Sequence, residues 1–149
     1  MYRALEVAQY IIRRCNQQKK SISNLKLQKI LYFVQAEFLV TTGNRCFSDE
    51  IEAWDFGPVV PEVYHHYKAY GSANIPVFRM NSDLDAEISK SDQIIMNGII
   101  DECSKYSASA LVQLTHNQAP WKNHYKRGCN NEIPFTEIKA YFDEDKYGN

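Results

Sequence analysis

Four histidines are the first residues of this 149-residue chain to consider for acid–base chemistry or metal binding. His65 and His66 are adjacent, so on a helix their side chains project about 100° apart and cannot chelate one ion as an i, i+4 pair would. His116 and His124 flank Trp121, and no carboxylate or cysteine lies at a spacing that completes a metal site. We therefore expect no metal, no cofactor and no enzymatic activity. A catalytic site around His65 or His116 is kept as an alternative, which would need a cavity joining a histidine to a carboxylate or thiol.

The cysteines and the overall composition exclude several other classes of protein. The four cysteines (15, 46, 103 and 129) form no Cys-x-x-Cys pair, so we expect free thiols rather than a zinc ribbon or a redox site. No apolar run approaches the roughly 20 residues that a bilayer crossing needs, and the first residues lack the order of a signal peptide. We therefore predict a cytoplasmic protein without membrane contact. The net charge of −1 argues against binding nucleic acid through phosphate neutralisation.

Aromatic residues offer binding chemistry where catalytic spacing is missing. Trp54 and Phe56 flank a predicted turn, Tyr64 follows on the next predicted helix, and Phe33 falls on the most open strip of an earlier helix. Aromatic anchors on a rigid scaffold are typical of protein-recognition surfaces. The alternative is that Trp54 and Tyr67 simply fill the core, as large aromatic residues usually do.

Charged residues beside these aromatics have two interpretations each. Glu52 is predicted either to bind an Arg or Lys of a partner protein, or to form a structural network with Lys29 or Gln35. Asp55 is interpreted as a cap for the helix that follows it.

The helices that position these residues are read from apolar periodicity. Residues 2–17 form an amphipathic helix, and Ser23 or Asn24 caps a second, central helix that ends at Gly43. This second helix is apolar on two sides, so Gln28 and Gln35 between the two stripes must find buried hydrogen-bond partners. The remaining strip is predicted to face solvent or a partner, and it carries Lys26, Lys29, Phe33 and Val40.

The rest of the chain predicts a short β element and further helices. Two extended pieces surround Cys46–Phe47 and Ile51–Trp54, and a third helix with Pro58 and Pro61 in its first turn runs to Tyr70. A connection at 72–84 precedes a helix at about 86–105, in which Gly98 predicts close packing, and helical segments follow after Ser107, near 118–121 and at about 135–142. We therefore predict a mainly α fold, a compact single-domain bundle of about six helices with a short two-stranded β-ribbon near residues 45–55.

Three runs within this framework resemble the Panacea domain of phage-associated GepA-like proteins and SocA-like antitoxins. They are KLQKILYFVQAEFL at 26–39, IEAWDFGPVVPEVYHHYKAYG at 51–71 and LVQLTHNQAPW at 111–121. The resemblance covers about residues 2–142 of a single domain at 1–149, followed by a polar tail at 143–149.

The resemblance implies an antitoxin in a bacterial prophage or other mobile element. Such a protein binds and neutralises a toxin encoded by an adjacent gene, either by sequestering it or by presenting it to a cellular protease. We predict these partner-binding residues: Phe33, Glu52, Trp54, Phe56, Tyr64 and Lys29. The alternative is a DNA-binding regulator of the same mobile element that uses Lys26 and Lys29, although a helix that is apolar on two sides fits a recognition helix poorly.

Overall fold

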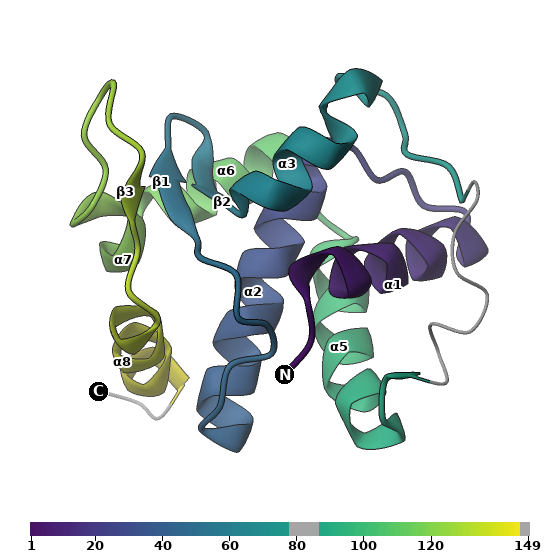
Figure 1. The fold of residues 1–149 in the computed structure, drawn as a ribbon, viewed down its shortest axis with the longest axis horizontal. Helices are drawn as coiled ribbons and strands as arrows, with labels where there is room; N and C mark the ends of the chain where they lie inside the picture. The colour runs from purple at the N-terminus through teal and green to yellow at the C-terminus, as the bar shows by residue number, and fades with distance from the viewer. Residues whose placement is uncertain (78–86, 147–149) are drawn as a thin grey trace.

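The computed structural model describes residues 1–77 and 87–146, apart from the side chains of 145 and 146, and this part of the chain is mainly helical with one small antiparallel sheet (Figure 1). Its elements are α1 (Ala4–Gln17), α2 (Asn24–Thr42), β1 (Glu52–Trp54), β2 (Gly57–Val59), α3 (Pro61–Tyr67), a 3-10 turn (Lys68–Tyr70), α5 (Lys90–Cys103), α6 (Ala108–His116), α7 (Ala119–Lys122), β3 (Asn131–Glu132) and α8 (Phe135–Lys146). The predicted fold class is confirmed.

Helix α2 is the centre of the fold, as predicted. It contacts α1, α3, α5, α6, α8 and β2, and Figure 1 shows it between α5 and α8. The Ser23 side chain accepts a hydrogen bond from the Lys26 N–H at 3.3 Å, which caps the helix. Gly43, at φ +78°, ends the helix in the left-handed conformation that glycine adopts without steric cost.

The prediction that one strip of α2 is open to solvent or a partner is wrong. Lys26 is only 9% exposed and its Nζ donates to the Ser104 carbonyl after α5, while Lys29 is completely buried. Phe33 is half-buried against the Phe142 ring of α8, with ring centroids 6.1 Å apart. The strip is covered because α5, α8 and β2 all pack on α2, and the periodicity of α2 alone carries no information about these distant segments.

Both glutamines of α2 have the buried partners that the sequence predicts. Gln28 Oε1 accepts from the Val60 N–H at 2.9 Å, and its Nε2 donates to Asn24. Gln35 Oε1 accepts from the N–H groups of Cys46 at 2.7 Å and Phe47 at 3.2 Å, and its Nε2 donates to the Phe47 carbonyl at 2.9 Å. One side chain thus supplies three hydrogen bonds to the irregular segment at Cys46–Phe47.

Replacement of Gln35 by Leu is expected to lower the free energy of unfolding by about 3 kcal/mol. The change leaves two backbone N–H groups and one carbonyl buried without partners, and each such group costs about 1–3 kcal/mol. Urea unfolding followed by circular dichroism measures the difference, with Gln113→Leu on the exposed face of α6 as the control. A loss of less than about 1 kcal/mol, the size of a surface effect, would contradict this role.

The β element differs in its pairing from the predicted ribbon. The sheet order is β2-β1-β3, and β1 pairs antiparallel with β2 through Ala53↔Pro58 and Trp54↔Gly57. Phe47, predicted to belong to the ribbon, instead makes a parallel bridge to Tyr2. The two-residue loop at 55–56 forms a tight hairpin, so Pro58 lies in strand β2 and not in the predicted helix. Because β2 is at the edge of the sheet, the missing N–H of Pro58 is tolerated.

The remaining helices follow the prediction with shifted ends. Helix α3 begins with Pro61 at its first position. Ser107 caps α6 by accepting from the Ala110 N–H, and α8 continues past the predicted end at 142 to Lys146. Gly98 is exposed, and a Cβ at this position would meet nothing within 4 Å beyond the backbone of its own helix, so its predicted close packing is wrong. Residues 78–86, which include part of the predicted 72–84 connection, lie outside the described residues.

The four cysteines are free thiols, as predicted. Cys15, Cys46 and Cys103 are buried in the core, and burial raises the pKa of each, that of Cys103 to about 12. Cys129 is half-exposed. Across residues 1–77 and 87–146, no helix combines the length and apolarity that crossing a membrane requires.

Candidate partner-binding site

The tip of the β1–β2 hairpin is held by the segment from the end of α6 to just beyond α7. Trp121 Nε1 donates to the Trp54 carbonyl at 2.8 Å, and His116 Nε2 lies 3.0 Å from the Asp55 carbonyl oxygen, so its Nε2–H tautomer donates there. The Tyr125 hydroxyl donates to Asp55 Oδ1 at 2.5 Å, which raises the pKa of Tyr125. The rings of His116, Trp121 and Tyr125 stack with centroids 4.1 and 4.5 Å apart. We call His116, Trp121 and Tyr125 the aromatic clamp.

The aromatic clamp corrects the interpretation of Asp55 and gives His116 a structural partner. Asp55 does not cap α3, which begins at Pro61, because β2 lies between them. His116 bonds the hairpin rather than the last carbonyls of its own helix, so its role is positional. The second and third sequence runs that resemble the Panacea domain therefore meet at the hairpin.

A buried lysine lies beneath the same hairpin. Lys29 Nζ donates to the Pro58 carbonyl at 2.8 Å, and burial lowers the pKa of Lys29 to about 7. A Cβ on Gly57 would lie 2.6 Å from Lys29 Cε and 2.7 Å from Thr115 Oγ1, and Gly57 has φ +105°. All three runs thus contribute to one contact, Lys29 from α2, Gly57 from the hairpin and Thr115 from α6. Lys29 has no surface to offer a partner, so its predicted role is corrected to that of a support for β2.

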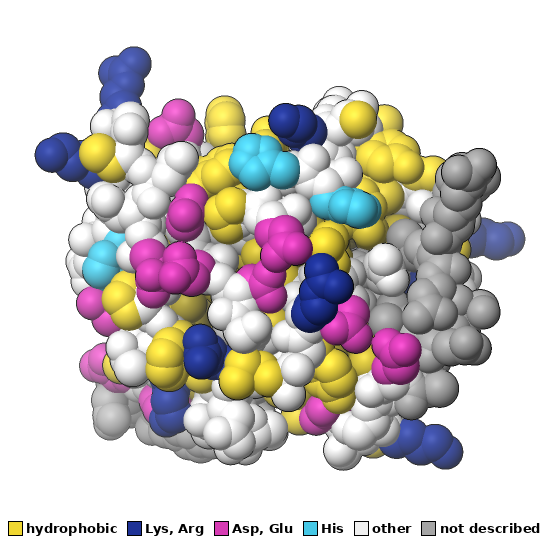
Figure 2. Space-filling view, viewed as in Figure 1, with side chains coloured by type: hydrophobic (Ala, Val, Ile, Leu, Met, Phe, Trp, Pro, Cys, Tyr) yellow, Lys and Arg dark blue, Asp and Glu magenta, His cyan; other side chains and the backbone are white. Residues whose placement is uncertain are grey.

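Acidic side chains surround the exposed face of this sheet. Figure 2 shows several of them over the region of the sheet and α3, with few basic side chains among them. Glu52 lies opposite Glu132 in the β1–β3 register. Glu52 Oε1 accepts from Trp54 Nε1 at 2.9 Å, so neither of its predicted partners, Lys29 and Gln35, is correct.

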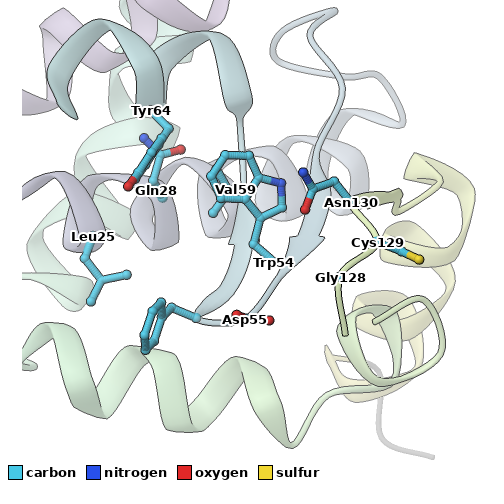
Figure 3. A pocket seen from close by; sticks show the side chains of 10 residues that line it. Leu25, Gln28, Trp54, Asp55, Val59, Tyr64, Gly128, Cys129 and Asn130 are labelled. Atoms are coloured by element: carbon cyan, nitrogen blue, oxygen red, sulfur yellow. The ribbon is translucent and has the colours of Figure 1, made fainter. Parts of the chain in front are cut away.

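A cavity of about 300 Å³ opens between the hairpin, the start of α2, α3 and the loop before β3 (Figure 3). It is lined by Leu25, Gln28, Trp54, Asp55, Phe56, Val59, Tyr64, Gly128, Cys129 and Asn130. The Trp54 and Tyr64 rings meet edge to face with centroids 5.0 Å apart, and Phe56 is 65% exposed. Because the lining has no Lys, Arg or His and its aromatic groups stand close together, the cavity suits an apolar side chain of a partner. We call it the hairpin pocket.

Three of the six predicted partner-binding residues line the hairpin pocket, and a fourth adjoins it. Trp54, Phe56 and Tyr64 line the hairpin pocket, and Glu52 bonds Trp54 from the adjoining surface. Phe33 packs against α8 outside the pocket lining. The prediction missed Leu25 and the loop at 128–130. The only sequence signal for this loop is the glycine at 128, and the structure shows that Gly128 forms a turn with φ +79°.

The residues on which the alternative functions depend lie outside the lining of the hairpin pocket. No histidine lines the hairpin pocket, and the described side chains contain no group of three His, Cys, Asp or Glu residues placed to hold a metal. Lys26 and Lys29, the lysines that the DNA-binding alternative uses, are both buried.

Comparison with known proteins agrees with the resemblance read from the sequence. Residues 27–122 match the family described as Antitoxin SocA-like, Panacea domain, and the chain belongs to this family. The Antitoxin SocA of Caulobacter vibrioides (strain NA1000 / CB15N) is 36% identical over 113 residues, which cover 67% of this chain and 58% of that protein. The chain thus spans little more than half the length of this relative. No solved structure matches the chain.

The family match divides the site into a scaffold and a rim. The residues that match contain Lys29, the hairpin, α3, His116 and Trp121, which together hold the hairpin pocket in place. Leu25, the loop at 128–130 and β3 lie outside the matching residues. The rim of the pocket is therefore formed in part by segments that the family match does not include.

Proposed function

We propose that this protein is an antitoxin that neutralises a protein toxin encoded by an adjacent gene, and that it binds the toxin directly through the hairpin pocket. The setting that we infer is the cytoplasm of a bacterium, with both genes in a prophage or other mobile element. Family membership and the name of the Caulobacter relative support the antitoxin role.

The observation that carries the proposed binding mode is an exposed aromatic surface whose backbone is held by hydrogen bonds from the scaffold. Phe56 is 65% exposed at the tip of a two-residue loop. Residues at such exposed tips are usually mobile, because they make few buried contacts. Here both ends of the loop are fixed, by Trp121 on the Trp54 carbonyl and by Lys29 on the Pro58 carbonyl. A surface that is ordered before binding loses less conformational entropy on association, and this favours a tight protein–protein contact.

Co-expression with the adjacent open reading frame tests the function. We expect the adjacent gene product to arrest growth when it is expressed alone, and this protein to restore growth and to co-purify with that product. An adjacent product that is not toxic, or one whose toxicity persists while this protein is present in soluble form, would contradict the proposal.

The half-life of the toxin separates the two modes of neutralisation. Sequestration predicts that the toxin accumulates in complex with this protein, because binding alone removes nothing. Presentation to a protease predicts that the toxin disappears faster when this protein is present and is stabilised in cells that lack the protease. A pulse-chase measurement with and without this protein distinguishes them.

A further inference from the structure

We propose that the hairpin pocket and the acidic surface beside it form one binding site for an extended segment of the partner, in which a large apolar side chain and a Lys or Arg stand two residues apart. The inference rests on the proposed function, since it names the chemistry of the toxin segment that the pocket takes. It goes beyond that function because it assigns a role to carboxylates that have no basic partner among the described residues.

The first observation is a pair of like charges placed side by side. The β1–β3 register sets Glu52 directly opposite Glu132, so both side chains project from the same face of the sheet. Like charges at opposed positions disfavour the sheet. Among the described residues, no Lys or Arg lies within salt-bridge distance of either carboxylate. A bound cation would offset this repulsion.

The second observation is an open acidic groove that adjoins the pair. A cavity of about 380 Å³ is lined by Ser48, Asp49, Glu50, Glu52, Val60, Pro61 and Glu62. Two of these carboxylates have partners, since Asp49 accepts from the Ala4 N–H at 2.9 Å and Glu62 lies 3.5 Å from an exposed Arg3. Glu50 and Glu52 have no basic partner in the part of the chain that the structure describes.

Glu52 connects the acidic groove to the apolar pocket. Its Oε1 accepts from Trp54 Nε1, which holds the indole in the pocket wall, and its Oε2 has no hydrogen-bond partner among the described residues. Glu52 and Trp54 are two residues apart on one face of β1, a separation of about 7 Å along the strand. A partner segment in extended conformation repeats over the same distance, so its apolar and basic side chains at i and i+2 reach the two halves of the site together.

Charge complementarity selects a basic partner segment over an acidic one. The pocket lining contributes Asp55 and no cation, and the groove lining contributes four carboxylates and no cation. An acidic segment would meet like charges at each of these positions, which discriminates against wrong partners. Glu132 lies outside residues 27–122, which match the family, whereas the carboxylates of the groove and Asp55 lie within them.

Titration of the adjacent gene product into the wild type and into a Glu52→Gln/Glu132→Gln double variant tests the inference. Gln at 52 keeps an oxygen to accept from Trp54 Nε1, so the variant removes charge without releasing the indole. At about 50 mM salt we expect the variant to bind at least about 10-fold more weakly than the wild type. The affinity of the wild type should fall between about 50 and 300 mM salt, and the affinity of the variant should change much less. The matched control is Glu87→Gln/Glu144→Gln, two exposed carboxylates elsewhere, and it should bind as the wild type does.

A second arm uses defined peptides and does not depend on the toxin. The probe is Ser-Leu-Ser-Arg-Ser, compared with the same peptide carrying Glu in place of Arg, and binding is followed by the indole N–H signal of Trp54 in a proton–nitrogen correlation spectrum. We expect the Arg peptide to shift this signal in the wild type, and the Glu peptide to leave it unchanged. The double variant should respond to the Arg peptide at least several-fold more weakly.

The two arms separate failure of the inference from failure of the proposed function. If the adjacent gene product binds the wild type and the double variant equally, with the same dependence on salt, the inference is overturned and the antitoxin role stands. If that product binds neither protein, the proposed function fails, and the inference about the binding site is then tested by the peptides alone. Equal binding of the Arg and Glu peptides, or no binding of either, then overturns the inference.

Discussion

Replacement of Gly57 by Ala is expected to lower the free energy of unfolding by at least about 3 kcal/mol. Gly57 has φ +105°, a conformation that residues with a Cβ rarely adopt, which costs about 1–3 kcal/mol by itself. The new methyl group would also lie 2.6 Å from Lys29 Cε and 2.7 Å from Thr115 Oγ1. Both neighbours are completely buried, so neither can move without disturbing the packing around it.

Two other glycines separate the conformational cost from the steric one. Gly43 also has a positive φ, +78°, but a Cβ there would meet nothing within 4 Å beyond its chain neighbours, so Gly43→Ala should cost only about 1 kcal/mol. Gly98 lies inside α5 with open space around it, and Gly98→Ala should stabilise by up to about 1 kcal/mol. Urea unfolding of the three variants gives the comparison. A cost for Gly57→Ala no greater than that for Gly43→Ala would show that the contact with Lys29 and Thr115 is not tight.

Replacement of Lys29 by Met is expected to change how stability depends on pH. Burial lowers the folded-state pKa of Lys29 to about 7, whereas the unfolded chain titrates near 10.5. Between these values the unfolded state binds one proton more than the folded state does, so wild-type stability rises with pH by up to about 1.4 kcal/mol per unit. Below pH 7 both states bind the proton and this contribution to the slope disappears.

The Met variant lacks the titrating group and should lack this rise. At pH 6 it is expected to be about 2–4 kcal/mol more stable than the wild type, because a buried charge without a carboxylate partner is replaced by an apolar chain of similar volume. By about pH 9.5 the wild type should instead be about 1 kcal/mol more stable than the Met variant, because the Pro58 carbonyl has no donor in the variant.

Urea unfolding at several pH values measures this difference, and titration of other groups cancels between the two proteins. Lys68→Met, on the exposed 3-10 turn, is the control and should differ from the wild type by a constant amount. A wild-type-minus-Lys29→Met difference that stays flat from pH 6 to about 9.5 would mean that Lys29 titrates as an exposed lysine does.

Local sequence patterns predicted the parts of the fold whose causes are local. The Ser23 cap, the Gly43 end and the need of Gln28 and Gln35 for buried hydrogen-bond partners follow from the residues of α2 and its ends. The strip with Lys26 and Lys29 was mispredicted because its cover comes from distant segments. A lysine on a helix normally predicts exposure, and only the tertiary contact with β2 overrides that preference.

In the candidate site, too, the residues close in the sequence could be predicted and those from distant segments could not. Trp54, Phe56 and Tyr64 belong to one hairpin and the helix that follows it, so their proximity could be predicted from chain order alone. The loop at 128–130 reaches the pocket because β3 pairs with β1 across more than half the chain, and a two-residue exposed strand has no recognisable pattern. The pairing of Pro58 with Ala53 was missed because Pro58 beside Pro61 also fits the first turn of a helix.

Isothermal titration of the adjacent gene product into Phe56→Ala and Phe135→Ala tests the central claim most directly. Both positions carry a phenylalanine on the surface, with 65% and 41% of the residue exposed, but only Phe56 lines the hairpin pocket. If the pocket binds the toxin, Phe56→Ala should raise Kd about 30-fold, or roughly 2 kcal/mol, without loss of stability, and Phe135→Ala should change Kd less than about two-fold. Equal affinities for the two variants and the wild type would contradict the account.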